Sequence, residues 1–160
     1  MSTTNDVEAP SAIIACPKCG KRNRVSAVGD GVPRCGNCHQ PLPWVVDADD
    51  TTFTDVVEKA RLPVLIDLWA PWCGPCRTVS PVLERLATER AGRLKLVKVN
   101  SDVASQVSRR FEVQAIPTLV LMNDGQVVSR QVGAAPAHAL RTWLDEALPE
   151  DSRAPDTPHS

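Results

Sequence analysis

Apolar residues follow two kinds of pattern along this chain. A short run, Val64–Trp69, is almost wholly apolar and follows a proline, which is typical of a strand buried inside a domain. Beyond the motif at 72–76, apolar residues recur at helical spacing as far as Leu86, and this predicts a helix that starts at about Cys73 and runs to Arg90. We therefore expect a buried strand that leads directly into a long helix.

The same patterns place the other elements of the chain. Before the buried strand we expect a short strand near Trp44 and a helix that begins near Asp49, with Phe53, Val56 and Val57 inward. After the long helix we expect a strand over 94–100 and a helix capped by Ser101 and Asp102, with Val103, Val107 and Phe111 inward. The chain should end with strands over 118–122 and 127–132, joined by a hairpin at 123–125, and a last helix from Pro136 with Leu140, Trp143, Leu144 and Leu148 on one face. Strands that alternate with helices predict an α/β sandwich.

The composition is that of a globular protein and limits the possible partners. Of 160 residues, 42% are hydrophobic and 23% are charged, and the net charge of −1 shows no bias toward nucleic acid or membrane surfaces. The length suits one main domain with a small module, and no apolar stretch reaches the roughly 18 residues of a membrane span. Residues 1–12 and 150–160 are polar, and we expect them to be disordered. The first ten residues lack the basic and apolar regions of a signal peptide, which predicts a cytoplasmic location.

Two cysteines, Cys73 and Cys76, lie where the buried strand meets the long helix. The free amides and the positive end of the helix dipole point at Cys73 there, and both favour the thiolate, which is the reactive form of cysteine. Because the two thiols are three positions apart, they can also close a small disulfide. The segment suits reversible dithiol chemistry, with Cys73 as the exposed nucleophile and Cys76 as the resolving thiol. The alternatives are a permanent local disulfide and half of a metal site.

Four further cysteines form two Cys-x-x-Cys pairs near the N-terminus, Cys16 with Cys19 and Cys35 with Cys38. Fifteen residues separate the pairs, which is within the range of paired zinc knuckles, and two such turns can aim four sulfurs at one tetrahedral point. We expect one Zn²⁺ ion there, structural or redox-sensing, in a module over 13–41 whose folding depends on the metal. A proline-rich link would join this module to a second domain over 42–149.

The surroundings of these four cysteines leave other interpretations open. Gly20 and Gly36 suit tight knuckles. The basic residues Lys18, Lys21, Arg22, Arg24 and Arg34 would offset the net charge of a four-thiolate zinc site. They could instead contact nucleic acid, although no aromatic side chain precedes Trp44 for base stacking. The run from Cys35 to His39 also matches a haem-attachment pattern, but haem proteins of that kind are usually exported. A ligand role for His39, structural disulfides and free thiols are the remaining alternatives.

The sequence around the inner cysteines resembles the thioredoxin family. Residues 72–76 read Trp-Cys-Gly-Pro-Cys, the active-site motif of that family, and Asp67, Ile116–Thr118 and Val132–Ala134 stand where the family has counterparts. The similarity extends over about 42–149. With the two upstream Cys-x-x-Cys pairs, the chain is similar to the zinc-binding thioredoxin 2 type of bacteria. The resemblance implies the thioredoxin fold, in which helices flank a central mixed sheet, preceded by a small zinc ribbon-like module.

The resemblance also implies roles for three residues near the cysteine pair. Asp67 stands where the family has a proton-transferring acid, and a carboxyl buried in an apolar strand should have a raised pKa. Lys98 would be its partner from the adjacent strand, unless it is a surface charge at the strand end. Pro117 matches a proline whose cis peptide bond lies against the sulfurs and turns the backbone of Ile116 toward an extended substrate. A purely structural acid at Asp67 and an ordinary strand-start proline at Pro117 are the alternatives.

A flat apolar surface around Cys73 is implied for substrate binding. Its members would be Trp72, Gly74, Pro75, Ile116, Gly133 and Ala134, and such a surface suits a protein that accepts many partners. The implied activity is the general reduction of disulfides in oxidised client proteins by a monomer, which an NADPH-dependent thioredoxin reductase recharges. We expect no nucleic acid or membrane partner. A disulfide oxidase or isomerase, and a redox-gated, chaperone-like module in which the zinc ribbon holds a client, are the alternative functions.

Overall fold

A mixed sheet of five strands forms the centre of the protein in this computed structural model, which describes residues 10–29 and 31–148. In the order β3-β5-β4-β6-β7, the strands are β3 (Trp44–Ala48), β5 (Lys95–Asn100), β4 (Val64–Trp69), β6 (Thr118–Asn123) and β7 (Gln126–Val132). Strand β5 runs parallel to β3 and β4, whereas β6 runs antiparallel to β4 and β7. The α/β fold expected from the sequence, with a central mixed sheet, is confirmed.

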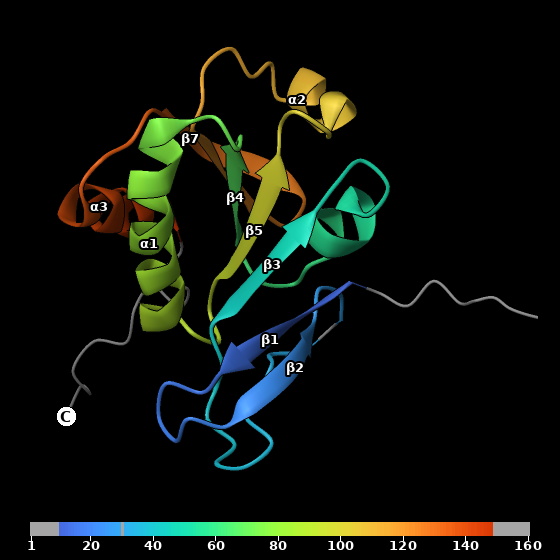
Figure 1. The fold of residues 1–160 in the computed structure, drawn as a ribbon, viewed down its shortest axis with the longest axis vertical. Coiled ribbons are helices and arrows are strands. Elements are labelled where there is room, and N and C mark those ends of the chain that lie inside the picture. Colours follow the sequence, from blue (N-terminus) through green and yellow to red (C-terminus); the bar gives the residue numbers. More distant parts are fainter. Residues whose placement is uncertain (1–9, 30, 149–160) are drawn as a thin grey trace, which may run out of the picture.

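Helices cover both faces of this sheet. Helices α1 (Gly74–Glu89) and α3 (Ala137–Ala147) lie on one side (Figure 1). Helix α2 (Ser105–Arg110) and the short helix η1 (Thr54–Glu58) contribute to the apolar cluster on the opposite face. Leu83 and Leu86 of α1 and Leu140 and Leu144 of α3 share one buried apolar cluster with the sheet. None of the helices in the described part of the chain is both long and apolar enough to cross a membrane.

The alternation of side chains along β4 decides on which face of the sheet the carboxyl of Asp67 lies. Val64, Ile66 and Leu68 belong to the apolar cluster that also contains residues of η1 and α2, whereas Leu65 belongs to the cluster of α1 and α3. Since successive residues of a strand point to opposite faces, Asp67 shares the face of Leu65. The sequence therefore places one buried acid beneath α1.

The N-terminal segment folds as a separate small hairpin below the main sheet in Figure 1. Strands β1 (Ser11–Ala15) and β2 (Arg22–Ser26) pair antiparallel, and the loop after them leads to β3. Strand β1 begins at Ser11, and the carbonyl oxygen of Pro10 accepts the amide of Ala27, so the expected disorder is wrong for residues 10–12. The other residues expected to be disordered, 1–9 and 150–160, lie outside the described residues. The boundaries of the module and of the second domain stay predictions.

A fully buried lysine links this hairpin to the rest of the fold. Nζ of Lys95 donates hydrogen bonds of 2.6 Å each to the carbonyl oxygens of Ala27 and Val56, and it lies 4.1 Å from the centre of the Trp44 ring. Nε1 of Trp44 donates to the carbonyl oxygen of Ser26 at 2.9 Å. Burial lowers the pKa of Lys95 to about 8. The segment before β3, η1 and the sheet thus meet at one polar contact inside an apolar junction.

The third expected helix begins later than predicted. Its first residue is Ser105 and its N-cap is Ala104, so the expected capping by Ser101 and Asp102 is wrong. The residues before it form turns in which the amide of Asp102 donates to Oδ1 of Asn100, and Val103 is 68% exposed rather than inward. Val107 and Phe111 are buried as expected, because they lie on the side of α2 that faces the sheet.

Candidate functional site

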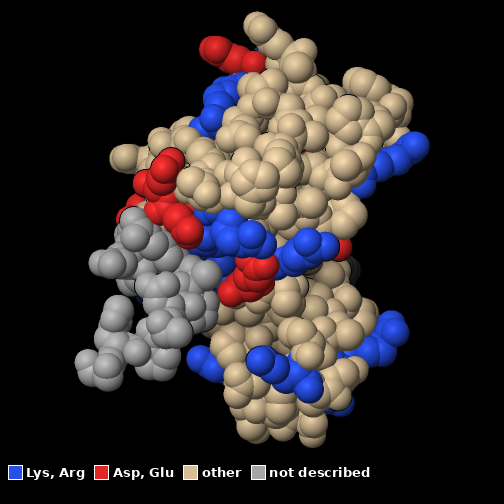
Figure 2. All heavy atoms as spheres, turned by 90° about the vertical axis from the view of Figure 1, so that its left-hand side faces the viewer, with Lys and Arg blue, Asp and Glu red and all other residues tan. Residues whose placement is uncertain are grey.

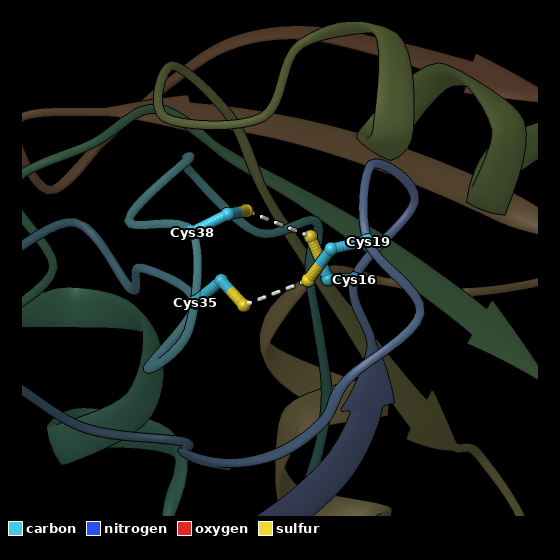
Figure 3. A group of neighbouring side chains, drawn as sticks. All are labelled: Cys16, Cys19, Cys35 and Cys38. Atoms are coloured by element: carbon cyan, nitrogen blue, oxygen red, sulfur yellow. Dashed lines mark hydrogen bonds between the residues drawn. The ribbon is translucent and has the colours of Figure 1, made fainter.

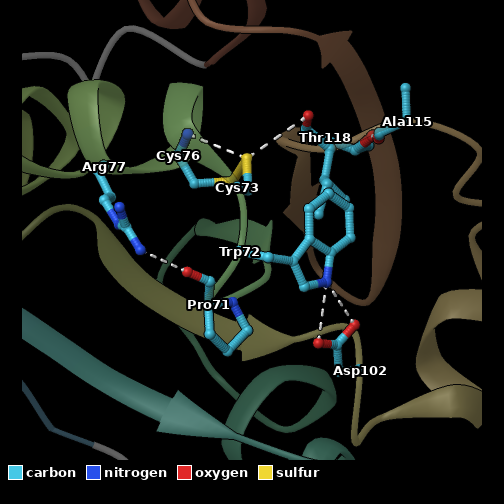
Figure 4. The surroundings of a disulfide bond; sticks show 9 residues. Pro71, Trp72, Cys73, Cys76, Arg77, Asp102, Ala115 and Thr118 are labelled. Carbon is cyan, nitrogen blue, oxygen red and sulfur yellow. Dashed lines mark hydrogen bonds between the residues drawn. A yellow bond between two sulfur atoms is a disulfide. The ribbon is translucent and has the colours of Figure 1, made fainter.

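The two inner cysteines form a disulfide at the N-terminus of α1 (Figure 4). Cys73 is the N-cap residue with an extended backbone, and Pro75 occupies the first turn, where a missing amide proton costs nothing. The amide of Cys76 donates to Sγ of Cys73 at 3.1 Å, so this sulfur accepts one of the helix's free amides. The strand-to-helix turn expected from the sequence thus places Cys73 Sγ in the field that favours its thiolate.

Both sulfur-bearing residues are buried in the disulfide form. Cys73 is 3% exposed and Cys76 is 5% exposed, so the expectation of an exposed Cys73 is wrong for this state of the protein. The reason is packing: the pair forms an apolar cluster with Ala70, with Trp69 and Ile116 against it. Attack on a bulky substrate therefore requires a partner that fits the surface around Cys73 closely.

The segment before β6 lies directly against the disulfide. The Ile116–Pro117 peptide bond is cis, and Sγ of Cys73 lies 3.8 Å from the carbonyl oxygen of Ile116. The carbonyl oxygen of Pro117 accepts the amide of Gly133 at 2.8 Å, and Gly133 has the left-handed φ of 95° that favours glycine. The structure thus brings the Ile116–Pro117 segment and the residue after β7 together beside Cys73.

The remaining residues of the expected substrate surface are exposed to solvent, and Trp72 lines a shallow pocket together with Ile116. Trp72 is 69% exposed, and Gly74, Pro75 and Ala134 are exposed as well. Nε1 of Trp72 donates to both carboxylate oxygens of Asp102, at 3.2 and 3.1 Å (Figure 4). Reasoning from the sequence missed Asp102 as a neighbour of the redox pair, because thirty positions separate the two residues and no local pattern connects them.

The buried carboxyl of Asp67 faces a cavity of about 170 Å³ behind the disulfide, and Oδ1 has no hydrogen-bond partner among the described residues. Cys76, Ser80 and Lys98 line the same cavity. Burial raises the pKa of Asp67 to about 6; the charge of Lys98 opposes this rise and that of Glu84 adds to it. A base that titrates near neutral pH therefore shares a cavity with the resolving thiol.

Lys98 lies beside Asp67, but its ammonium faces elsewhere. The two residues are partners in the register of β4 and β5, as the resemblance implies. Nζ of Lys98 nevertheless donates to Oγ of Ser80 at 2.6 Å and lies 3.2 Å from Oε2 of Glu84. Ser80 and Glu84 were not predicted as site residues. They follow Cys76 by four and eight positions, and this helical spacing, which puts them on the same side of α1 as Cys76, could have identified them.

The four N-terminal cysteines come together in one cluster (Figure 3). Their sulfurs all lie within 4.8 Å of one another, with Cys16 and Cys38 at 3.6 Å and Cys19 and Cys35 also at 3.6 Å. A tetrahedral site with Zn–S bonds of about 2.3 Å has sulfur–sulfur edges of about 3.8 Å. None of the four forms a disulfide in the structure, which argues against the alternative of structural disulfides. The cluster fits one tetrahedral metal ion.

The two knuckles are built alike, with one difference from the expectation. In the first, Gly20 has a φ of 84°, and the amide of Lys18 donates to Sγ of Cys16. In the second, the residue with left-handed φ is His39, at 66°, rather than Gly36, because His39 is the residue that follows Cys38 as Gly20 follows Cys19. The amide of Asn37 donates to Sγ of Cys35. The backbone thus orients both pairs through amide–sulfur contacts.

Positive charge surrounds this cluster. The five basic residues named in the sequence analysis are all exposed, and the sequence between residues 10 and 46 contains a single acidic residue, Asp30. On the face shown in Figure 2, the lower end of the molecule carries blue side chains and no red ones. This charge would offset the net charge of −2 that four thiolates leave on a divalent ion.

Comparison with known proteins gives one family. The family described as Thioredoxin matches residues 44–146 of the chain. Similar proteins include a thioredoxin of Haemophilus influenzae, 45% identical over 65% of this chain and 97% of its own, and thioredoxin 1 of Synechococcus elongatus, 44% identical over 62% of this chain and 92% of its own. Thioredoxin C-3 of Corynebacterium nephridii is 39% identical over 85% of this chain and 95% of its own, so that match includes part of the segment before Trp44.

Proposed function

The chain belongs to the thioredoxin family and is a protein disulfide reductase of that type, and from this premise we propose that Cys73 and Cys76 carry its dithiol–disulfide chemistry. The observation that supports this assignment most strongly is the disulfide between them at the N-terminus of α1. The amide of Cys76 and the helix terminus favour a thiolate on Cys73, which makes it the nucleophile of the pair.

In the proposed reaction, the Cys73 thiolate attacks one sulfur of a client disulfide. That disulfide breaks, a mixed disulfide forms, and the leaving client thiolate takes a proton from solvent. Cys76 then loses its proton, attacks Sγ of Cys73 and expels the second client thiolate. The protein ends with the Cys73–Cys76 disulfide and the client with two thiols, so one electron pair has moved from protein to client.

We propose that Asp67 accepts the proton of Cys76. Both residues line the same cavity, and Oδ1 has no hydrogen-bond partner among the described residues. A carboxyl with a pKa of about 6 is ionised at neutral pH yet basic enough to accept a proton, and burial supplies this value. Lys98 would moderate the pKa through its charge. The role of Pro117 would be to hold the Ile116 backbone beside Cys73 for an extended client segment.

The surface formed by Trp72, Gly74, Pro75, Ile116, Gly133 and Ala134 is proposed to bind the client. The large exposed indole of Trp72 and the small residues around it offer a flat apolar contact with few side-chain constraints. A surface of this kind favours a general reductase of many oxidised proteins. An NADPH-dependent thioredoxin reductase would restore the dithiol, and the chain would act as a monomer.

We also propose that the four N-terminal cysteines hold Zn²⁺ in a module over 13–41, ahead of a redox domain over 42–149, which would make the chain a zinc-binding thioredoxin of the second type. The support is the tetrahedral fit of the sulfurs and the match of thioredoxin C-3 to part of this segment. When bound, the metal would supply a cross-link between the two knuckles. A redox-sensing role for it, and a cytoplasmic location that keeps the thiols reduced, belong to the same proposal.

A coupled assay tests this function. The full chain with zinc, a thioredoxin reductase, NADPH and insulin should oxidise NADPH in proportion to the insulin disulfides reduced. Cys73→Ser should abolish turnover, whereas Glu146→Gln, an exposed change on α3, should leave it unchanged. Normal turnover by the Cys73→Ser protein would refute the assignment of the nucleophile.

A further inference from the structure

Two polar side chains of α1 hold the ammonium of Lys98 at the wall of the redox cavity. Nζ of Lys98 donates to Oγ of Ser80 at 2.6 Å and pairs with Oε2 of Glu84 at 3.2 Å, and Oγ of Ser80 lies 3.4 Å from the same carboxylate oxygen. The side chain of Lys98 is 20% exposed and that of Glu84 is 51% exposed. The contact therefore runs from the cavity wall outward to solvent.

The buried carboxyl of Asp67 lies on the inner side of this contact. Asp67 and Lys98 are neighbours in the register of β4 and β5, and both line the cavity with Cys76 and Ser80. A lysine with four rotatable methylene groups could turn its ammonium toward Asp67, whose Oδ1 lacks a partner among the described residues. Ser80 and Glu84 instead hold that charge at the helix.

From this arrangement we propose that Glu84, assisted by Ser80, is a positioning residue of the disulfide reaction: it anchors the Lys98 ammonium against α1 and so keeps the Asp67 carboxylate basic enough to take the proton of Cys76. The inference rests on the proposed role of Asp67. The proton passes from the Cys76 thiol to the Asp67 carboxylate, and the electron pair left on the sulfur forms the bond to Sγ of Cys73. After the client thiolate has left, Asp67 returns the proton to solvent through the cavity.

The two charges that act on Asp67, those of Lys98 and Glu84, work in opposite directions. Strand β5 contributes Lys98, and α1 contributes Glu84, Arg77 and the thiol of Cys76; the register partner on β6 is the apolar Leu119. Nη2 of Arg77 donates to the carbonyl oxygen of Pro71. The charge of Glu84 raises the pKa of Asp67 and that of Lys98 lowers it. Removal of the Glu84 charge would end a repulsion and leave the ammonium uncompensated, and both effects lower the pKa of Asp67.

The direct test is the titration of Asp67 in the oxidised, full-length protein, followed by the ¹³C signal of its carboxyl carbon. Glu84→Gln should lower the midpoint by about half a pH unit, as expected for a partly exposed charge at the cavity edge. Glu84→Asp should restore much of the wild-type value. Glu146→Gln, which removes the same charge from an exposed position on α3, should leave the midpoint unchanged. A midpoint in Glu84→Gln equal to that of the wild type would overturn the proposal.

Ser80→Ala separates the anchoring effect from the charge of Glu84. It removes the 2.6 Å hydrogen bond without a change in net charge, and the freed ammonium should lower the Asp67 midpoint in the same direction. A midpoint shift in Glu84→Gln with none in Ser80→Ala would overturn the role of Ser80 as an anchor. A purely structural contribution would lower stability and leave both midpoints in place.

Kinetics then connect the midpoint to the reaction. The acid limb of the rate–pH profile for client reduction should move down with the Asp67 midpoint in Glu84→Gln. Above pH 7, where Asp67 is ionised in both proteins, the rate of the variant should be lower because its carboxylate is a weaker base. If Asp67→Asn showed a wild-type profile, the proposed role of Asp67 would fail even where Glu84→Gln moved the titration. A moved titration with an unmoved profile in Glu84→Gln would overturn the positioning role.

Discussion

The buried carboxyl of Asp67 should make the fold less stable as the pH rises. Burial raises its pKa from the ordinary 3.8 to about 6, and the residue is only 1% exposed. Between these two values the folded protein holds a proton that the unfolded chain has released, so the free energy of unfolding falls as the pH rises from about 4 to about 6, and the loss persists above that range. Because one pKa unit corresponds to about 1.4 kcal/mol, ionised Asp67 costs the folded state about 3 kcal/mol.

Urea unfolding of the oxidised full-length chain and of Asp67→Asn, at pH 4 and at pH 8, measures this cost. The asparagine variant avoids the charge, and at pH 4 the unfolded wild type has already released more than half of this proton. The stability of the variant relative to the wild type should therefore be about 2 kcal/mol more favourable at pH 8 than at pH 4. The matched control Glu146→Gln removes an exposed carboxyl and should show no such change between the two pH values. A stability difference between Asp67→Asn and the wild type that is the same at both pH values would refute the account of Asp67 as a group destabilised by burial.

Three further predictions concern the resolving thiol, the N-terminal module and its junction. Cys76→Ser should accumulate a mixed disulfide between Cys73 and a client, which peptide mapping would locate; a free client would contradict the assigned order of attack. The full chain should contain one equivalent of zinc by elemental analysis. A chelator strong enough to remove the zinc should abolish the protection of the β1–β2 amides from hydrogen exchange. Protection that survives complete metal removal would show that the module folds without metal. Lys95→Met leaves the carbonyl oxygens of Ala27 and Val56 without their donor, so it should lower the free energy of unfolding, measured by urea denaturation, by about 2 kcal/mol. The control Lys59→Met, at an exposed ion pair, should change it by less than about 0.5 kcal/mol. Equal effects of the two substitutions would contradict the role of Lys95 at the junction.

Local pattern was sufficient for the elements that carry the redox pair. The apolar run of β4, the helical spacing after Cys76 and the paired Cys-x-x-Cys motifs each depend on residues close in sequence, and the fold follows these expectations. Asp67 could be identified because an acid in an apolar strand stands out in the sequence itself. The late start of α2 was missed because Ser101 and Asp102 are good capping residues that the structure uses in turns after β5 instead.

Contacts between elements that are distant in the sequence could not be predicted from it. Lys95 occupies a strand position that reads as polar, yet carbonyl groups of Ala27 and Val56 and the ring of Trp44 enclose it. The ammonium of Lys98 is directed by Glu84, fourteen positions earlier on a helix, rather than by its neighbour in the sheet. Such partners are set by how α1 and the N-terminal segment pack on the sheet, and no single-residue propensity reports that packing.

The most direct test of the central claim is a single turnover of the reduced, zinc-loaded full chain with an excess of a disulfide client, followed by quenching with acid and mapping of disulfides by mass spectrometry. The account predicts one new disulfide per chain, between Cys73 and Cys76, for each client disulfide that is reduced, with the other four cysteines still thiols. A client reduced while Cys73 and Cys76 remain thiols, or a new disulfide among Cys16, Cys19, Cys35 and Cys38 in its place, would contradict it.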